Sequence, residues 1–451
     1  MISIFSLSFS HPGSIIIQSL LELTTYVFSW NELKVNFLIF ISLIKFILYM
    51  THEDIKKEVK KITKSIFEEI VDIRRWIHQH PELSFQEKDT SEYICSILSK
   101  YNIPFISNIG GYGVVACIES STPNDKVIAI RADMDALPIH EKNDVIYKSI
   151  NDGVMHACGH DVHTAIALGT AIVLNKLKNK LKGTIKFIFQ PAEEQLPGGA
   201  SIMIKEGVLE KPHVDLILAL HVYPEFEVGN VGFRSGKYMA ACDELSITIN
   251  GKGGHAALPD KVINPITIAS KFILDVKDKA MNLSFGARYV LEFGDFHAYG
   301  ASNVIPDTAS IQGTMRTLDE NFRIRLHQLL IDEAELLFKD TGASCDLNIK
   351  KGYPTLYNNP ELTKRCQNIS EYFLDSDSVK ELDIRMASED FSYFSQACPA
   401  CFFRLGVGNA KKDITNLVHS PYFNIDEKSI EIGVGLMSYI TISNLLNLKK
   451  F

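Results

Sequence analysis

The segment GVMHACGHDVHTA crowds three histidines, one cysteine and one aspartate into a short stretch of chain. Such a cluster can be a reactive thiol beside a base, a metal site, or part of a buried strand. His156, Cys158 and His160 alternate, so in an extended segment their side chains would leave from one face. Asp161 and Thr164 are predicted to cap the helix that follows. This places the cluster in a strand-to-helix loop, where α/β folds bind ligands.

A pair of adjacent carboxylates, Glu193 and Glu194, follows the apolar run FIFQ and precedes a loop rich in Pro and Gly. Two neighbouring carboxylates repel each other unless a cation absorbs part of their charge. Because their side chains point in different directions, one can bind a metal while the other serves as a general base. A solvated loop pair is the alternative, but the position after a buried strand and a His/Cys loop favours a functional pair.

Two further histidines lie at the ends of apolar segments: His221 in LILALHVYP and His419 in LVHSPYF. Together with Cys158, His160 and Glu194 they supply a thiolate, a carboxylate and imidazoles. This set suits two borderline divalent ions such as Zn²⁺, Mn²⁺ or Co²⁺. A paired metal site polarises a carbonyl and lowers the pKa of a shared water, so the pattern indicates hydrolytic chemistry.

Strands and helices that alternate along the chain predict an α/β sandwich with a largely parallel or mixed sheet. The hydrophobic pattern predicts helices over 53–80, 90–101, 164–178 and 199–205, and strands over 113–118, 126–132, 183–190 and 214–223. Near Gly229 the order changes to strand, helix, two strands, helix and strand, which predicts a compact α+β unit of the ferredoxin-like type. We therefore predict a catalytic domain over 51–230 and 351–451, with a smaller domain, 231–350, inserted into it.

The composition narrows the class of protein. A chain of 451 residues exceeds the size at which a single core usually stops growing, which fits two domains. The net charge of -8 and the lack of a long Lys/Arg run argue against nucleic acid as a partner. The cysteines are scattered through mostly apolar sequence, and we expect buried free thiols, with a redox pair of Cys398 and Cys401 as the alternative. Free thiols predict a reduced compartment and hence a cytoplasmic protein.

The first 50 residues differ from the rest because they are rich in Ile, Phe, Leu and Ser. Their most apolar run, 35–50, is interrupted by Lys45 and is short for a membrane span of about 20 residues. Polar, helical sequence follows Met50 at once, so we expect the native start there. A membrane anchor through residues 35–50 is the alternative.

Longer motifs occur in the order in which a known family carries them. They are IRRWIHQHPELSFQE, GVVACIES, IRADMDALPI, MHACGHDVHTAIALG, FQPAEE, GKGGHAALP, ASNVIPDTASIQGTMRT, MASEDFSYF and LGVG…HSPYFNIDE. Over about residues 55–447 the chain resembles M20 metallopeptidases of the amidohydrolase subgroup. That subgroup includes aminoacylases, hippurate hydrolases, N-acetyl-diaminopimelate deacetylases, thermostable carboxypeptidases and plant indole-acetyl amino-acid hydrolases. The resemblance implies a homodimer formed through the inserted domain.

The resemblance also assigns roles to individual residues. Five match the family's metal ligands, with the cysteine at the bridging position: Cys158, His160, Glu194, His221 and His419. Glu193 matches the catalytic base, and Asp135 matches a carboxylate that orients a ligand. His255, Asn303 and Arg316 match substrate-contacting positions, with His255 reaching the site of a partner subunit. The chain departs from many relatives at Asp260 and Asn264, where they carry His and Asp, which affects the dimer cleft and not the chemistry.

The function implied is a dinuclear metal amidohydrolase that cleaves N-acyl amino acids or related small carboxylated amides, with Glu193 as base. A metallo-carboxypeptidase or dipeptidase of the same fold is the near alternative. A cysteine hydrolase using Cys158 would explain neither the Glu193–Glu194 pair nor His221 and His419. A catalytically idle binding protein is disfavoured because every expected ligand and the base are present.

Overall fold

The computed structural model describes residues 52–120, 122–339 and 341–446. The predicted anchor at 35–50 and the predicted start at Met50 lie outside these residues. Within them, no helix combines the length and the apolar character that crossing a membrane requires.

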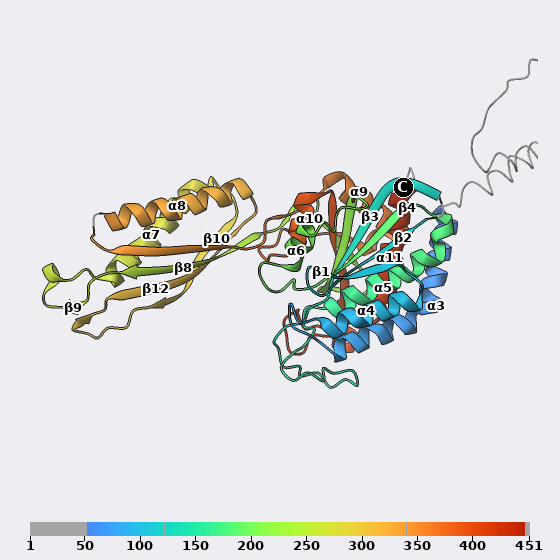
Figure 1. The fold of residues 1–451 in the computed structure, drawn as a ribbon, viewed down its shortest axis with the longest axis horizontal. Coiled ribbons are helices and arrows are strands. Elements are labelled where there is room, and N and C mark those ends of the chain that lie inside the picture. Colours follow the sequence, from blue (N-terminus) through green and yellow to red (C-terminus); the bar gives the residue numbers. More distant parts are fainter. Residues whose placement is uncertain (1–51, 121, 340, 447–451) are drawn as a thin grey trace, which may run out of the picture. The chain divides into compact units, whose positions relative to one another are not determined.

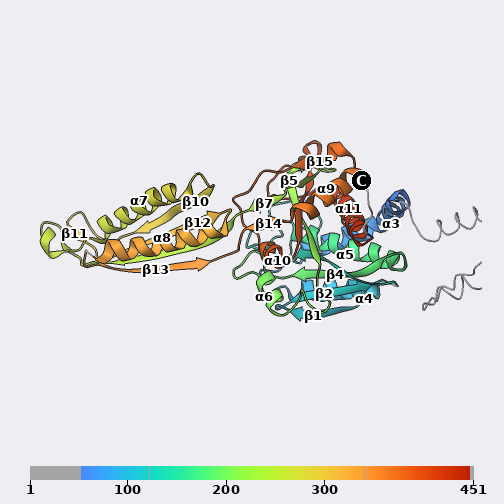
Figure 2. The same cartoon turned by 90° about the horizontal axis from the view of Figure 1, so that it is seen from above.

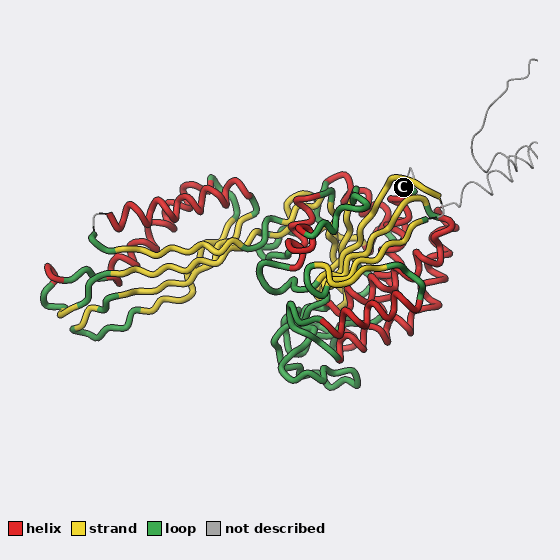
Figure 3. Tube along the Cα trace, viewed as in Figure 1, coloured by secondary structure: helices red, strands yellow, loops and turns green. Residues whose placement is uncertain are grey.

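A mixed eight-stranded sheet forms the centre of the larger part of the fold, in the order β1-β2-β4-β3-β5-β16-β6-β15 (Figures 1 and 3). Its inner strands are mostly apolar and almost wholly buried, as expected for strands covered by helices on both faces. The strands are β1 (Phe105–Ile109), β2 (Gly113–Glu119), β3 (Thr122–Asp133), β4 (Lys182–Gln190), β5 (Leu216–Glu227), β6 (Val231–Phe233), β15 (Val379–Glu381) and β16 (Ala400–Gly408). The parallel pairs β3–β4, β3–β5 and β5–β16 bring the carboxyl ends of these strands to one edge.

Helices cover both faces of this sheet, with α3, α4 and α5 on one side and α6 and α10 on the other (Figures 1 and 2). The helices are α3 (His52–Gln79), α4 (Lys88–Lys100), α5 (His160–Leu177), α6 (Gly199–Lys205), α9 (Pro360–Phe373), α10 (Phe391–Ala397) and α11 (Lys428–Leu445). Helices α5 and α11 are almost entirely buried and approach closely, because a Cβ on Gly433 would lie 2.5 Å from Ile166. The predicted α/β class is confirmed.

A four-stranded antiparallel sheet, in the order β10-β12-β8-β13, carries two helices and has a separate apolar core (Figures 1 and 2). Its elements are β8 (Ala241–Asn250), α7 (Pro265–Ser284), β10 (Tyr289–His297), β12 (Thr308–Thr317), α8 (Glu320–Lys339) and β13 (Ser344–Lys351). The order strand, helix, two strands, helix and strand is the ferredoxin-like pattern predicted from the sequence. A small two-stranded sheet is formed by β9 (Gly254–His255), which follows β8 in the chain, and β11 (Val304–Ile305), which follows β10.

The limits of the two predicted domains stay predictions. The strand β6 falls inside the predicted insert, 231–350, yet it pairs with β16 in the eight-stranded sheet. Next to it, β7 (Gly236–Met239) pairs with β14 (Leu356–Asn358), so two short strands join the segments that enter and leave the insert.

Candidate active site

The loop 156–160 does not have the predicted extended conformation. Cys158 lies in a turn, Gly159 has a φ of 83°, and His160 is already the first residue of α5. The predicted capping is also wrong, because no side chain caps this helix. Asp161 instead accepts a hydrogen bond from Arg74 Nε at 2.7 Å. Because its carboxylate is paired with this arginine, it does not cap the helix.

The turn separates the three side chains that were expected to share a face. Cys158 and His160 lie in one cluster with His221, in which one ligand atom of each lies within 4.8 Å of the others. His156 is in none of these clusters, and neither of its buried ring nitrogens has a hydrogen-bond partner. Burial lowers the pKa of His156 to about 4, so its imidazole is neutral.

Cys158 belongs to a second cluster as well, formed with Glu194 and His419 within the same 4.8 Å limit. The structure therefore brings all five predicted ligands together and shares the cysteine between two groups of three. The carboxylate of Glu194 connects the groups, since its Oε1 lies 3.3 Å from His419 Nε2 and 3.9 Å from His160 Nε2. A sulfur atom common to two groups of potential ligands is the arrangement that a bridging ligand needs.

His419 reaches this cluster from a distant part of the chain. Its backbone N–H donates to the carbonyl of Ala157 at 2.7 Å, which fastens its loop to the turn that carries Cys158. It has a φ of 65°, a conformation that is uncommon for residues other than glycine and that often marks functional sites. Ala192, directly before Glu193, also has a positive φ of 52°.

A backbone contact orients the imidazole of His221, one of the predicted ligands. Its Nδ1 donates to the carbonyl of Val222 at 2.8 Å, which leaves Nε2 free to face Cys158 Sγ at 3.4 Å. Burial lowers the pKa of His221 well below its ordinary value, so the ring is neutral, as a metal ligand must be.

Asp135 holds both acidic residues and a histidine in place. Its buried carboxylate accepts hydrogen bonds from the backbone N–H groups of Glu193 and Glu194, both at 3.0 Å, and from Ser84 Oγ at 2.6 Å. Its Oδ1 also lies 3.2 Å from His160 Nδ1. Burial alone would raise the pKa of Asp135, but the hydrogen bond and charge of His160 lower it. A carboxylate of this kind fixes the orientation of a ligating imidazole.

Two observations test whether a metal fits here. Among the described residues, the buried atoms His160 Nε2 and Glu194 Oε1 have no hydrogen-bond partner, although both face the cluster. Contacts with Cys158 and Glu194 also raise the pKa of His419 to about 10, so these groups favour a positive charge between them. The cluster thus has buried acceptors without partners, and its surroundings favour positive charge. Both properties fit the binding of divalent cations.

His163, the third histidine of the segment, has a partner on each ring nitrogen. Its Nδ1 lies 2.6 Å from Asp133 Oδ1, and its Nε2 accepts from the backbone N–H of Val222 at 2.9 Å. Both ring nitrogens are therefore committed. Cys158 and His160, the two predicted ligands of this segment, join the group of His221. His156 joins no group of potential ligands, whereas His163 groups with Asp133 and His160.

Glu193 lies beside the cluster and is only 7% exposed. The hydroxyl of Tyr353 donates to its backbone carbonyl at 2.5 Å, and the backbone N–H of Asp390 lies 3.4 Å from its Oε1. Burial raises the pKa of Glu193 well above its ordinary value, and the charges of Glu389 and Glu194 raise it further. A buried carboxyl with a raised pKa suits a group that must take up and release a proton.

The predicted substrate contacts lie on the inserted segment. His255 and Asn303 are exposed neighbours at the two-stranded β9–β11 sheet, where the N–H of Ala256 donates to the carbonyl of Asn303 at 3.0 Å. No hydrogen bond or ion pair of the described chain joins either side chain to the metal cluster. Arg316, on β12, is half-buried and donates from Nη1 to the carbonyl of Met386 at 3.1 Å. The structure thus connects Arg316, but not the other two, to the part that carries the cluster.

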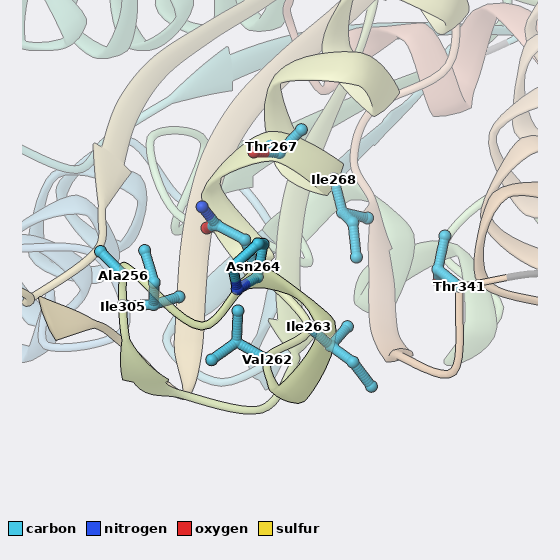
Figure 4. A pocket seen from close by; sticks show the side chains of 9 residues that line it. Ala256, Val262, Ile263, Asn264, Thr267, Ile268, Ile305 and Thr341 are labelled. Atoms are coloured by element: carbon cyan, nitrogen blue, oxygen red, sulfur yellow. The ribbon is translucent and has the colours of Figure 1, made fainter.

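A cavity of about 480 Å³ adjoins the β9–β11 sheet at the start of α7 (Figure 4). Its lining is mostly apolar and includes Val262, Ile263 and Ile305 together with Asn264. The side chain of Asn264 accepts from the N–H of Ile266 at 3.0 Å and so caps α7. None of the predicted ligands lines this cavity.

Several residues of the site were not singled out from the sequence. The guanidinium of Arg131 lies among the carboxylates of Asp133, Glu389 and Asp390, and the last two lie beside Glu193. All are buried. The signal was present in the motifs IRADMDALPI and MASEDFSYF, which hold charged residues within apolar sequence, but their pairing depends on contacts between distant segments.

Comparison with known proteins shows the family to which the chain belongs. The model of the peptidase family M20/M25/M40 matches residues 129–442. Thermostable carboxypeptidase 2 of Saccharolobus solfataricus is 37% identical over 384 residues, which is 84% of this chain and 96% of that protein. The N-acetyl-L-cysteine deacetylase of Bacillus subtilis is 36% identical over 399 residues, or 87% of this chain and 92% of that protein.

Among solved structures, the Bacillus subtilis YXEP protein, described as a dinuclear metal binding peptidase from the M20 family, has a TM-score of 0.73 and 31% identity. The match covers 85% of this chain and 100% of that one. The family model, the relatives and the fold agree with one another. The chain belongs to the peptidase family M20/M25/M40 and is a metal-dependent hydrolase of amide or peptide bonds.

Proposed function

We propose that this protein hydrolyses the amide bond of N-acyl amino acids or related small amides with a free carboxylate. The observation that carries the proposal is the cluster in which Cys158 is shared between two groups of ligands, with the buried carboxyl of Glu193 beside it. Cys158, His160, Glu194, His221 and His419 would hold two divalent ions, which can be Mn²⁺, Zn²⁺ or Co²⁺. Bound divalent ions supply Lewis acidity for the carbonyl and make water a better nucleophile at neutral pH.

The residues of the chain supply the remaining steps. Glu193 accepts a proton from the attacking water and later delivers it to the leaving nitrogen, which turns the nitrogen into a neutral amine. Its backbone is fixed by Asp135 and Tyr353, so its carboxyl stays beside the ligand cluster while its protonation state changes. Glu194 has the geometry of a ligand instead, because its carboxylate faces two imidazoles.

We also infer a homodimer formed through the inserted segment, 231–350. His255 and Asn303 are polar, exposed and adjacent, and in a single chain neither contacts the cluster. In a dimer they can complete the substrate site of the partner, as the family resemblance implies. Analytical ultracentrifugation tests this state, and a monomer with full activity would contradict it.

We expect a cytoplasmic location.

A substrate screen tests the proposed function. Purified protein should be assayed with N-acetyl, N-benzoyl and N-succinyl amino acids and with dipeptides, each with added Mn²⁺, Co²⁺ or Zn²⁺. We expect metal-dependent release of the free amino acid from at least one N-acyl series. Cleavage of dipeptides alone would support the carboxypeptidase or dipeptidase alternative and overturn the N-acyl assignment.

Replacing Arg316 tests how the substrate carboxylate is recognised. A guanidinium binds a carboxylate through charge-assisted hydrogen bonds, so Arg316→Ala should lower kcat/KM for N-acyl amino acids by about 10- to 100-fold. The same substrates with the carboxylate converted to an amide should lose much less. Arg325→Ala, which removes an exposed arginine of α8, is the matched control. Equal losses on both kinds of substrate would show that Arg316 does not read the carboxylate.

A further inference from the structure

One buried guanidinium lies at the centre of a charged cluster that the proposed chemistry does not use. Arg131, at the end of β3, is 2% exposed, and its nitrogens are all directed at side-chain oxygens. Nη1 donates to Asp133 at 2.6 Å, Nη2 donates to Asp390 at 2.7 Å, and Nε donates to Gln190 at 2.7 Å. Nη2 also lies 3.1 Å from Glu389 Oε1. We call Arg131 with these four partners the Arg131 cluster.

Asp390 connects this cluster to the loop that carries the proposed base. Its Oδ2 accepts from Gln190 Nε2 at 2.7 Å, where the loop begins, and from the N–H of Ala200 at 3.0 Å, where the loop ends. Between these points its backbone N–H lies 3.4 Å from Glu193 Oε1. One residue therefore contacts the start, the end and the proposed catalytic side chain of the loop 190–200.

The fit between Asp390 and this loop leaves little space for adjustment. A Cβ on Gly198 would lie 2.7 Å from Asp390 Oδ2, and Gly198 has a φ of 81°. The loop can thus lie against the carboxylate only because a glycine stands at this position. A displacement of Asp390 would therefore shift the loop and, with it, Glu193.

The electrostatics explain why a single arginine is decisive. Asp133, Glu389 and Asp390 converge on one guanidinium in a buried site, with Glu193 beside them. Without the guanidinium, these carboxylates would repel one another in a medium that screens charge poorly. A guanidinium also offers its donors in a fixed planar fork, whereas a lysine offers one point charge. Arg131 reaches Asp133, Gln190 and Asp390 from three separate nitrogens, whereas the donors of a lysine all leave one nitrogen.

We propose that Arg131 is a positioning residue for the base, holding Asp390 so that the loop 190–200 places Glu193 against the ligand cluster. The inference rests on the proposed role of Glu193. Arg131 and Asp390 act through Glu193 and do not touch the reacting atoms. Neither residue contacts any of the five proposed metal ligands through a hydrogen bond in the described structure, so metal content and positioning of the base should be separable.

Two variants test this role. Arg131→Lys keeps a positive charge but removes the fork. Asp390→Asn keeps an acceptor for Arg131 but directs an amide N–H₂ at the donors on Gln190 and Ala200. For both we expect kcat to fall by about 10²-fold, the loss that a displacement of about 1 Å typically causes, with a much smaller change in KM. Metal content measured by elemental analysis should stay near that of the wild type.

Arg323→Lys is the matched control, because Arg323 is also buried and paired with a carboxylate, Asp243, at 2.9 Å, but lies in the insert. It should keep kcat within a few-fold of the wild type. Unchanged kcat in both test variants, or a loss of kcat that parallels a loss of metal, would overturn the proposal. Failure of both variants to fold by circular dichroism would also count against it, since the cluster would then serve the fold. Full activity of Glu193→Gln would instead overturn the proposed base.

Discussion

Replacing Glu193 by glutamine should lower kcat by about 10²- to 10⁴-fold, the loss that follows removal of one general base. Glutamine keeps the size and polarity of the side chain but cannot accept the proton from water. Because the backbone N–H of Glu193 bonds to Asp135 and its carbonyl to Tyr353, the loop should keep its conformation. Elemental analysis should therefore find metal content near that of the wild type.

Glu194→Gln is the natural counterpart, since the two residues are adjacent and carry the same side chain. Its carboxylate faces His160 and His419, so the amide should bind metal more weakly. Added metal should restore part of its activity, whereas excess metal should not rescue Glu193→Gln. The reverse pattern, with Glu193→Gln losing metal and Glu194→Gln inactive but fully loaded, would exchange the two roles.

Cys158→Ala should lower the affinity for both metal ions and not for one alone. The thiolate is shared between the group of His160 and His221 and the group of Glu194 and His419, so alanine removes a ligand from each. The loss should exceed the roughly 10- to 100-fold that replacing an outer-shell partner causes. Inductively coupled plasma mass spectrometry after dialysis against a dilute chelator measures the occupancy.

Cys366→Ala is a suitable control, because that thiol is also buried but belongs to none of the ligand groups of the described chain. Full occupancy of Cys158→Ala would remove the bridging assignment. Thiol alkylation separates this role from that of a nucleophile: activity of the metal-loaded enzyme should resist alkylation and disappear with chelator. Rapid inactivation by alkylation in the presence of bound metal would instead favour a cysteine hydrolase.

Elements with a strong local pattern were predictable from the sequence. The run GTIKFIFQ predicted β4, and the short helix over 199–205 was placed at the bounds that α6 has in the structure. The edge strand β1 was missed because its polar residues Ser107 and Asn108 give it no apolar pattern. The start of α5 was placed four residues late, since Gly159 and His160 do not resemble a helix start and their conformation depends on contacts with other segments.

The residues of the candidate site that lie in short sequence motifs could be predicted. Spacing and residue type indicated Cys158, Glu194 and His419 as ligands, and the structure gathers them. The role of Arg131 could not be read in this way, because its partner Asp390 follows it by 259 positions. Contacts at such separation depend on the order of strands in the sheet, which hydrophobic periodicity does not specify. Whether the ring nitrogens of His156 and His163 have hydrogen-bond partners was equally unpredictable, since this depends on which residues of other segments lie beside each imidazole.

The position of β16 has a consequence for how the protein is made. This strand comes from near the end of the chain, yet it lies between β5 and β6, in the interior of the sheet. A nascent chain that has left the ribosome only as far as the insert would carry β5 paired with β3 but without β16 on its other side, and it would lack His419. The insert has its own apolar core and can fold earlier, but the sheet must wait for the last segment. Synthesis of nearly the whole polypeptide therefore precedes assembly of the proposed five-ligand site, and during that interval the open strand edge is a natural target for chaperones.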